Sequence, residues 1–132
     1  KPHLVSRISG TPQEAEQVFT ASERGRVPLS AATLQAIREG LDGVTSGEGG
    51  TALGAFEGAT FTSAGKTGTA ETPQEKPHAW FAGYAPVEAP QIAVAVVVEN
   101  SGEGSVFAAP ICRQVMEAFF YGPPPPETEE EE

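Results

Sequence analysis

Residues 92–98 form a run of seven consecutive apolar residues, and four of the seven are valines. β-Branched residues favour strands, and an unbroken apolar run predicts a strand that is buried on both faces of a sheet. The segment 60–72 is rich in threonine without a helical period, and 78–85 contains three aromatic residues, so both also predict strands. A proline lies at each end of the link between 78–85 and the third strand, 91–99, and an antiparallel hairpin is the simplest connection.

Two amphipathic segments predict helices beside this sheet. In residues 30–45, apolar side chains recur at steps of three and four, at Leu34, Ile37, Leu41 and Val44, and predict one buried helix face. In residues 106–121, the face predicted to cover the sheet carries Phe107, Ile111, Val115, Ala118 and Phe119. Cys112 lies beside that face and far from any histidine in sequence, so we expect a small packing residue and not a nucleophile. The expected fold class is α+β.

The chain ends set the expected domain limits. A length of 132 residues fits one domain, which we place at 1–121, with a short strand near residues 3–8. Residues 122–132 contain four prolines and five glutamates and predict a disordered tail. The chain starts with Lys1 and not with methionine, so we expect a piece of a longer protein, with some apolar surface left uncovered when the piece stands alone.

Composition excludes several classes of function. The formal net charge is −10, so nucleic acid and anionic membrane surfaces are not expected partners. One cysteine cannot form an internal disulfide, and the longest apolar run is far shorter than a membrane span, which needs about 20 residues. His3 and His78 stand alone, without the spacing of a metal site, and we expect neither a metal nor a cofactor.

The segment 65–71, Gly-Lys-Thr-Gly-Thr-Ala-Glu, carries the chemistry. Gly65 and Gly68 remove side chains from a predicted strand, so that another backbone or a ligand can lie against it. Lys66 adds a positive charge, and Thr67 and Thr69 add hydroxyl donors. A lysine and hydroxyls beside open backbone suit a peptide that ends in a carboxylate and binds as an added strand.

The triplet Lys66-Thr67-Gly68 resembles the lysine-threonine-glycine box of the serine penicillin-recognising proteins. Further blocks resemble consecutive stretches of the class B penicillin-binding proteins, most of all the elongation-type group of penicillin-binding protein 2. These blocks are residues 1–5, 50–52, 78–86, 92–100 and 108–110. The resemblance covers nearly the whole chain except the tail and implies the C-terminal portion of a transpeptidase domain.

The resemblance implies a peptidoglycan D,D-transpeptidase that forms a serine acyl-enzyme and also binds β-lactams. Lys66 and Thr69 would be catalytic, and Thr67, Gly68 and Thr69 would bind the D-Ala-D-Ala end of a stem peptide. The amide of Thr69 would supply half of the oxyanion hole. The family also implies a membrane anchor, a place on the outer face of the bacterial cytoplasmic membrane, and a partner glycosyltransferase.

Two other catalytic boxes of the family are not found in the sequence. Ser63 and Lys66 fit the spelling S-x-x-K, but their surroundings predict a strand and not a helix start. Gly65-Lys66-Thr67 fits the end of a phosphate-binding loop, but Thr60 stands where that loop needs a glycine. We therefore expect the nucleophile upstream and this chain alone to be inactive.

Two alternatives stay open. A β-lactam sensor or a β-lactamase would carry the same box, and the block order favours the cell-wall enzyme. A non-catalytic module would bind peptides reversibly without an acyl intermediate. Trp80, Phe81 and Tyr84 are expected in the core, and Glu71 and Glu99 as charges at strand ends.

Overall fold

The computed structural model describes residues 7–11, 15–20 and 22–123, and it divides the chain into two units, Lys1–Ala31 and Ala32–Glu132. In the first unit, β1 (Arg7–Ile8) and β2 (Gln17–Val18) form a small antiparallel ladder. Arg7 pairs with Glu16 beside this ladder, with the Nε and Oε1 atoms 3.1 Å apart. The short strand predicted near 3–8 is present at its end, whereas residues 3–6 lie outside the described part of the chain, and β2 is not among the predicted strands.

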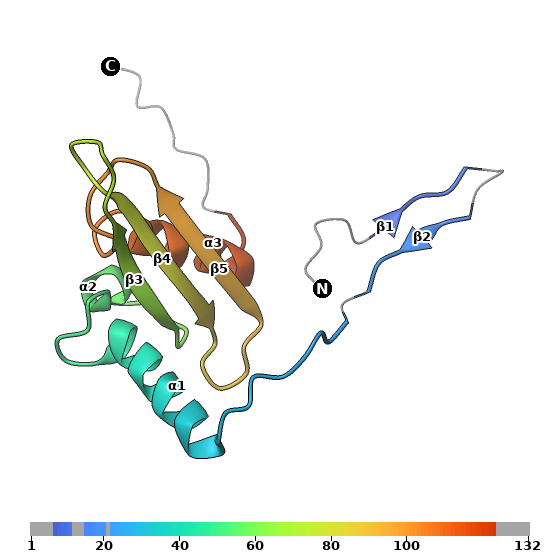
Figure 1. Ribbon diagram of the computed structural model, residues 1–132, viewed down its shortest axis with the longest axis horizontal. Coiled ribbons are helices and arrows are strands. Elements are labelled where there is room, and N and C mark those ends of the chain that lie inside the picture. The colour runs from blue at the N-terminus through green and yellow to red at the C-terminus, as the bar shows by residue number, and fades with distance from the viewer. Residues whose placement is uncertain (1–6, 12–14, 21, 124–132) are drawn as a thin grey trace. The chain divides into compact units, whose positions relative to one another are not determined.

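The second unit is built on a three-stranded antiparallel sheet in the order β3-β4-β5 (Figure 1). The strands are β3 (Ala64–Ala70), β4 (His78–Ala85) and β5 (Ile92–Val98). Each lies within one of the three predicted ranges, and the hairpin between the last two is confirmed. The chain order of the strands is also their spatial order, so that β3 and β5 form the two edges of this sheet.

In the described part of the chain, three helices accompany the sheet: α1 (Ala31–Ser46), α2 (Leu53–Phe56) and α3 (Ala108–Tyr121). Helix α3 packs across β4 and β5, and Figure 1 shows it behind the sheet. Between the helix and the sheet lies a single buried cluster, in which Phe81 from β4 and Met116 from α3 are the largest fully buried side chains. Both predicted helices are therefore present, with α1 and α3 close to the predicted ranges, and the α+β class is confirmed.

The predicted packing face of α3 was wrong. The helix meets the sheet through Ala108, Cys112 and Met116, which have no exposed surface. Ile111, Val115 and Phe119 point away from the core and stay exposed. Ala108 and Cys112 are small and let the helix backbone approach the sheet closely, whereas the bulkier face would hold it away. The bulky apolar stripe is thus an outer surface within the described residues.

The other face of the sheet is largely uncovered within the described residues. Along β5, half-buried residues alternate with exposed ones, so the predicted burial on both faces is not found. Leu34 and Ile37 of α1 are likewise exposed, and only the end of this helix packs, with Thr45 as its buried residue. Apolar surface therefore lies open on α1 and on one side of the sheet, as the sequence predicted for this chain standing alone.

The end of the chain is described only as far as Pro123, so most of the predicted disordered tail, 122–132, lies outside the described residues. Helix α3 ends at Tyr121, and the backbone N–H of Gly122 donates to the carbonyl of Ala118. Within the described ranges, no helix has the length and apolar character that a membrane crossing requires.

Candidate functional site: the edge strand β3

Strand β3 carries the lysine-threonine-glycine box at the edge of the sheet. Its inner side pairs with β4, and among the described residues no strand pairs with its outer side (Figure 1). In the register of the pair, Lys66 lies opposite Ala82 and Thr67 lies opposite Phe81. Because neighbouring strand residues point to opposite faces, Lys66 and Gly68 belong to the open face, and Thr67 and Thr69 to the face that bears α3.

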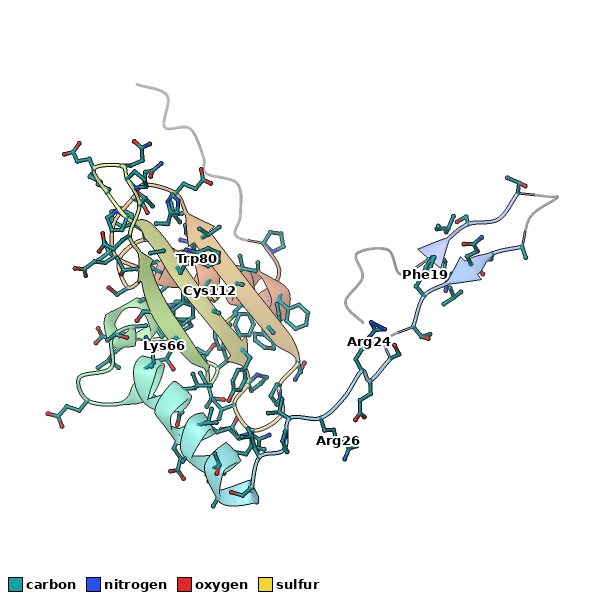
Figure 2. The ribbon with its side chains drawn as sticks, in the orientation of Figure 1. Phe19, Arg24, Arg26, Lys66, Trp80 and Cys112 are labelled. Carbon is teal, nitrogen blue, oxygen red and sulfur yellow. The ribbon has the colours of Figure 1, made fainter. Side chains whose placement is uncertain are left out.

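Lys66 is exposed and lies on β3 beside helix α1 (Figure 2). Its ammonium nitrogen Nζ donates to the carbonyl oxygen of Thr67 at 2.7 Å. Lys66 also lines a cavity of about 430 Å³ on the open face of the sheet, together with Leu41 and Tyr84. The positive charge therefore has a local acceptor in this chain and open space in front of it.

Thr67 shares a hydrogen bond with a residue from a preceding loop. The hydroxyl oxygens of Thr51 and Thr67 are 2.9 Å apart, and either can donate. Thr69 is exposed at the same edge, on the same face of the strand as Thr67. Two threonine hydroxyls on one face and a lysine on the other thus border the outer edge of β3.

Gly65 and Gly68 of β3 make room for other parts of the protein. A β-carbon on Gly65 would collide with the ring of Phe81 and would lie 2.8 Å from the carbonyl oxygen of Ala82. A β-carbon on Gly68 would lie 3.1 Å from the β-carbon of Trp80. Gly65 therefore serves the packing of a core aromatic ring, so that its absent side chain opens the strand to the core and not to a ligand.

The loop between β5 and α3 passes over β3 at Gly68. A β-carbon on Gly104 in this loop would lie 2.5 Å from the carbonyl oxygen of Gly68 and 3.0 Å from its nitrogen, and would collide with the carbonyl of Trp80. The loop is fixed at its start because the backbone N–H of Asn100 donates to Nδ1 of His78 at 2.9 Å. His78 therefore holds the loop that supports the box.

Helix α2 and the turn after it are held by Arg113 of α3. Its Nη1 donates to the carbonyl of Glu57 at 2.7 Å and to that of Ala55 at 3.3 Å, and its Nε pairs with Glu117 at 2.8 Å. Phe56 at the end of α2 packs on Phe81, with ring centroids 5.5 Å apart. The segment that leads into β3 is thereby tied to the same core as the strand itself.

Other residues considered in the sequence lie away from any site. Ser63 is buried and its carbonyl accepts a hydrogen bond from the hydroxyl of Thr45, so it is not exposed as a nucleophile would be. Cys112 is buried, as expected of a packing residue, and burial raises the pKa of its thiol to about 11. Among the described residues, no group of three or more His, Cys, Asp or Glu side chains is placed to hold a metal ion.

The three aromatic residues of β4 differ. Phe81 is a core residue, as expected, whereas Tyr84 is half-buried. Trp80 is 44% exposed on the open face, so the expectation of a core position was wrong for it (Figure 2). The alternation along a strand with one covered face explains the difference, because Phe81 and Trp80 are sequence neighbours.

Sequence reasoning missed two residues that contact the box from loops outside the sheet, Thr51 and Gly104. Thr51 lies within one of the blocks that carried the family resemblance, residues 50–52, but nothing in that block indicates a contact with Thr67. Gly104 follows Gly102 in a loop, where glycine ordinarily reads as a turn residue. Only the folded structure brings either residue to β3.

Comparison with known proteins shows the family of this chain. Residues 1–117 match the family model described as the penicillin binding protein transpeptidase domain. The peptidoglycan D,D-transpeptidase MrdA of Haemophilus influenzae is 33% identical over an alignment of 136 residues, gaps included. This alignment covers 89% of this chain and 20% of that protein. The chain thus spans about a fifth of the length of this curated relative.

Solved structures give the same result. PBP2 of Pseudomonas aeruginosa in complex with WCK 5153 superposes with a TM-score of 0.68 at 38% identity, over 81% of this chain and 24% of that one. The imipenem acyl-enzyme of penicillin-binding protein A from Mycobacterium tuberculosis superposes with a TM-score of 0.65 at 35% identity, over 84% of this chain and 24% of that one. This chain therefore belongs to the penicillin-binding protein transpeptidase domain family, within the class B members that resemble penicillin-binding protein 2.

Proposed function

We propose that this chain is the part of a peptidoglycan D,D-transpeptidase that holds the substrate carboxylate and helps to stabilise the oxyanion. The observation that carries the proposal is the position of Lys66, Thr67 and Thr69 on an edge strand whose outer side is unpaired among the described residues. An unpaired strand edge offers N–H and C=O groups to an extended peptide, which binds as a further strand. The D-Ala-D-Ala end of a stem peptide has this form and ends in a carboxylate.

Each residue of the box has a role in the proposal. The hydroxyls of Thr67 and Thr69 donate to the terminal carboxylate, and Lys66 supplies a positive charge beside it. Backbone N–H and C=O groups of alternate strand residues point to the same edge, so Thr67 and Thr69 offer theirs together. The amide of Thr69 then forms half of the oxyanion hole, and the loss of one such donor costs about 3 kcal/mol in the transition state. Gly68 leaves the strand free of a side chain between the two threonines.

The reaction is an acyl transfer in two steps. A serine hydroxyl outside these 132 residues attacks the carbonyl between the two D-alanines, the peptide bond breaks, and the terminal D-alanine leaves with the proton. An amine of a neighbouring stem then attacks the acyl-enzyme, forms the cross-link and releases the serine. Lys66 assists proton movement through the serine of the family's second box, which also lies outside the chain. A β-lactam acylates the same nucleophile and stays bound.

The proposal extends to the setting of the whole protein. By family resemblance it would be anchored in the bacterial cytoplasmic membrane, act on its outer face and work with a glycosyltransferase. The acyl-enzyme of the Mycobacterium tuberculosis relative with imipenem supports the proposed reaction with β-lactams.

Acylation of the full-length protein by a fluorescent penicillin tests the proposal. We expect one stable adduct, located by peptide mapping on a serine outside these 132 residues. Lys66→Gln should slow acylation at least about tenfold, because the carboxylate of the bound penicillin loses its charged partner. Lys76→Gln, at an exposed position between β3 and β4, is the matched control and should leave the rate unchanged.

Four outcomes would contradict this function. An adduct on Ser63 would place the nucleophile in this chain. A folded full-length protein without any adduct would exclude the acyl-transfer mechanism. Rapid release of the hydrolysed penicillin would show a β-lactamase, and a sensor would acylate stably but would not cross-link stem peptides.

A further inference from the structure

Thr51 contacts the candidate carboxylate site without belonging to its strand. Its hydroxyl oxygen lies 2.9 Å from that of Thr67, although 16 residues separate the two in sequence. The contact is solvent-exposed, so neither hydroxyl needs the other merely to satisfy a buried polar group. Burial therefore does not explain why the hydroxyls of Thr51 and Thr67 pair at this exposed position.

The loop holds Thr51 firmly in place. The backbone N–H of the next residue, Ala52, donates to the carbonyl of Val44 at 2.9 Å, and the side chain of Ala52 is buried. The N–H of the preceding residue, Gly50, donates to the carbonyl of Gly47 at 2.8 Å. A β-carbon on Gly50 would lie 2.7 Å from the carbonyl oxygen of Val44 and would collide with that of Gly43. The end of helix α1 thus sets the position of Thr51 on both sides.

Hydroxyl chemistry gives this fixed contact a direction. A threonine hydroxyl has one proton to donate and lone pairs that accept. When the hydroxyl of Thr67 donates its hydrogen bond to a carboxylate, the Thr67 oxygen can only accept the hydrogen bond it shares with Thr51. Thr51 must then be the donor of that bond. Linked hydrogen bonds polarise one another, so the bond from Thr51 makes the Thr67 hydroxyl a better donor to the anion. The partner oxygen also removes rotational freedom from the Thr67 hydroxyl before the ligand arrives.

We propose that Thr51 is a positioning residue that orients the hydroxyl of Thr67 toward the substrate carboxylate, without touching the substrate itself. This inference rests on the proposed function, because it needs Thr67 to bind a carboxylate. It adds a residue outside the three family boxes, and it links recognition of the anion to the end of helix α1.

The test compares two ligands on the full-length protein. The second-order rate of acylation is measured with a penicillin and with the same penicillin after methylation of its carboxylate. Thr51→Val should slow acylation by the free carboxylate about fivefold, as expected for one hydrogen bond near a charged group. Acylation by the ester should change less than twofold. Thr51→Ser keeps the hydroxyl and should restore the rate.

Two further variants isolate the contact. In the background of Thr67→Val, Thr51→Val should have no additional effect, because the hydroxyl through which it acts is gone. Thr60→Val removes a hydroxyl that pairs with that of Tyr121 at 2.7 Å, away from the box, and should leave both acylation rates unchanged.

The outcomes separate the inference from the proposed function. An equal loss with both ligands would make Thr51 a structural residue and overturn the inference, as would an unchanged rate with the carboxylate ligand. An additional loss in the Thr67→Val background would show that Thr51 does not act through Thr67. A wild-type protein that no penicillin acylates would overturn the proposed function instead, and the inference with it.

Discussion

Gly104 packs directly against the backbone of Gly68, with so little space that a β-carbon at position 104 would lie 2.5 Å from the Gly68 carbonyl oxygen. Gly68 lies between the two threonines of the proposed carboxylate-binding strand, and Gly104 is buried in the loop that leads into helix α3. The carbonyl of Gly104 also accepts the N–H groups of Ala108 and Ala109 at the start of that helix. The same glycine therefore supports β3 and begins α3.

Gly104→Ala should displace β3 and impair the site. The added methyl meets backbone atoms of Gly68 and Trp80, which cannot rotate away as a flexible side chain would. Such overpacking costs about 1–3 kcal/mol of stability. We expect a lower melting temperature of the full-length protein and slower acylation by penicillin, measured on the same preparation.

The control is the same substitution where space is open. A β-carbon on Gly40 of helix α1 would meet no atom within 4 Å. Gly40→Ala should therefore stabilise the protein by up to about 1 kcal/mol, because alanine favours a helix. Equal losses in both variants would show that the contact between Gly104 and Gly68 has no special importance.

Thr69→Val separates two proposed roles of one residue. The variant loses the hydroxyl that would hold the carboxylate but keeps the backbone amide that would stabilise the oxyanion. We expect the acylation rate of the full-length protein to fall about ten- to hundredfold, the amount of one hydrogen bond to an anion. Because Thr69 is exposed, the melting temperature should stay unchanged. A fall of several hundredfold at unchanged stability would contradict this division of roles.

The sheet could be predicted well because each of its strands has a strong local sequence signal. The apolar run 92–98, the threonine-rich segment and the aromatic segment each match a strand, and each link is short. The packing face of α3 could not be predicted in the same way. Apolar residues occupy most of the circumference of this helix, so periodicity alone cannot choose between Met116 and its bulkier neighbour Phe119.

The candidate site was predictable only along its own strand. Lys66, Thr67, Gly68 and Thr69 lie in one contiguous motif, which a reading of the sequence can find. Thr51 and Gly104 reach the motif through tertiary structure, from segments 16 residues before Thr67 and 36 after Gly68. Strand β2 escaped prediction because it is two residues long, too short to show a period.

Met116→Ala tests the revised packing face of α3. Met116 is fully buried between the helix and the sheet, and truncation of such a side chain leaves a cavity. We expect a loss of about 2–4 kcal/mol in the free energy of unfolding. Gln114→Ala on the exposed side of the same helix should change it by less than about 0.5 kcal/mol. Similar effects of the two substitutions would argue against this orientation of the helix.

Cys112 makes the stability of the domain depend on alkaline pH. Burial raises the pKa of its thiol from 9.0 to about 11, because the charged thiolate is disfavoured in the core between α3 and the sheet. The unfolded chain loses this proton first, so the contribution is fully present below pH 9 and is lost as the pH rises toward 11. The loss amounts to at most about 2–3 kcal/mol.

Other groups also titrate in this range, so the measurement is a difference. The free energy of unfolding is followed from pH 8 to pH 11 for the wild type and for Cys112→Ala, which has no thiol to ionise. We expect the wild type to lose more stability than the variant above pH 9, and Cys112 to react with iodoacetamide only when the domain unfolds. Parallel pH profiles, or rapid labelling of the folded protein, would mean that the thiol is not buried against the sheet.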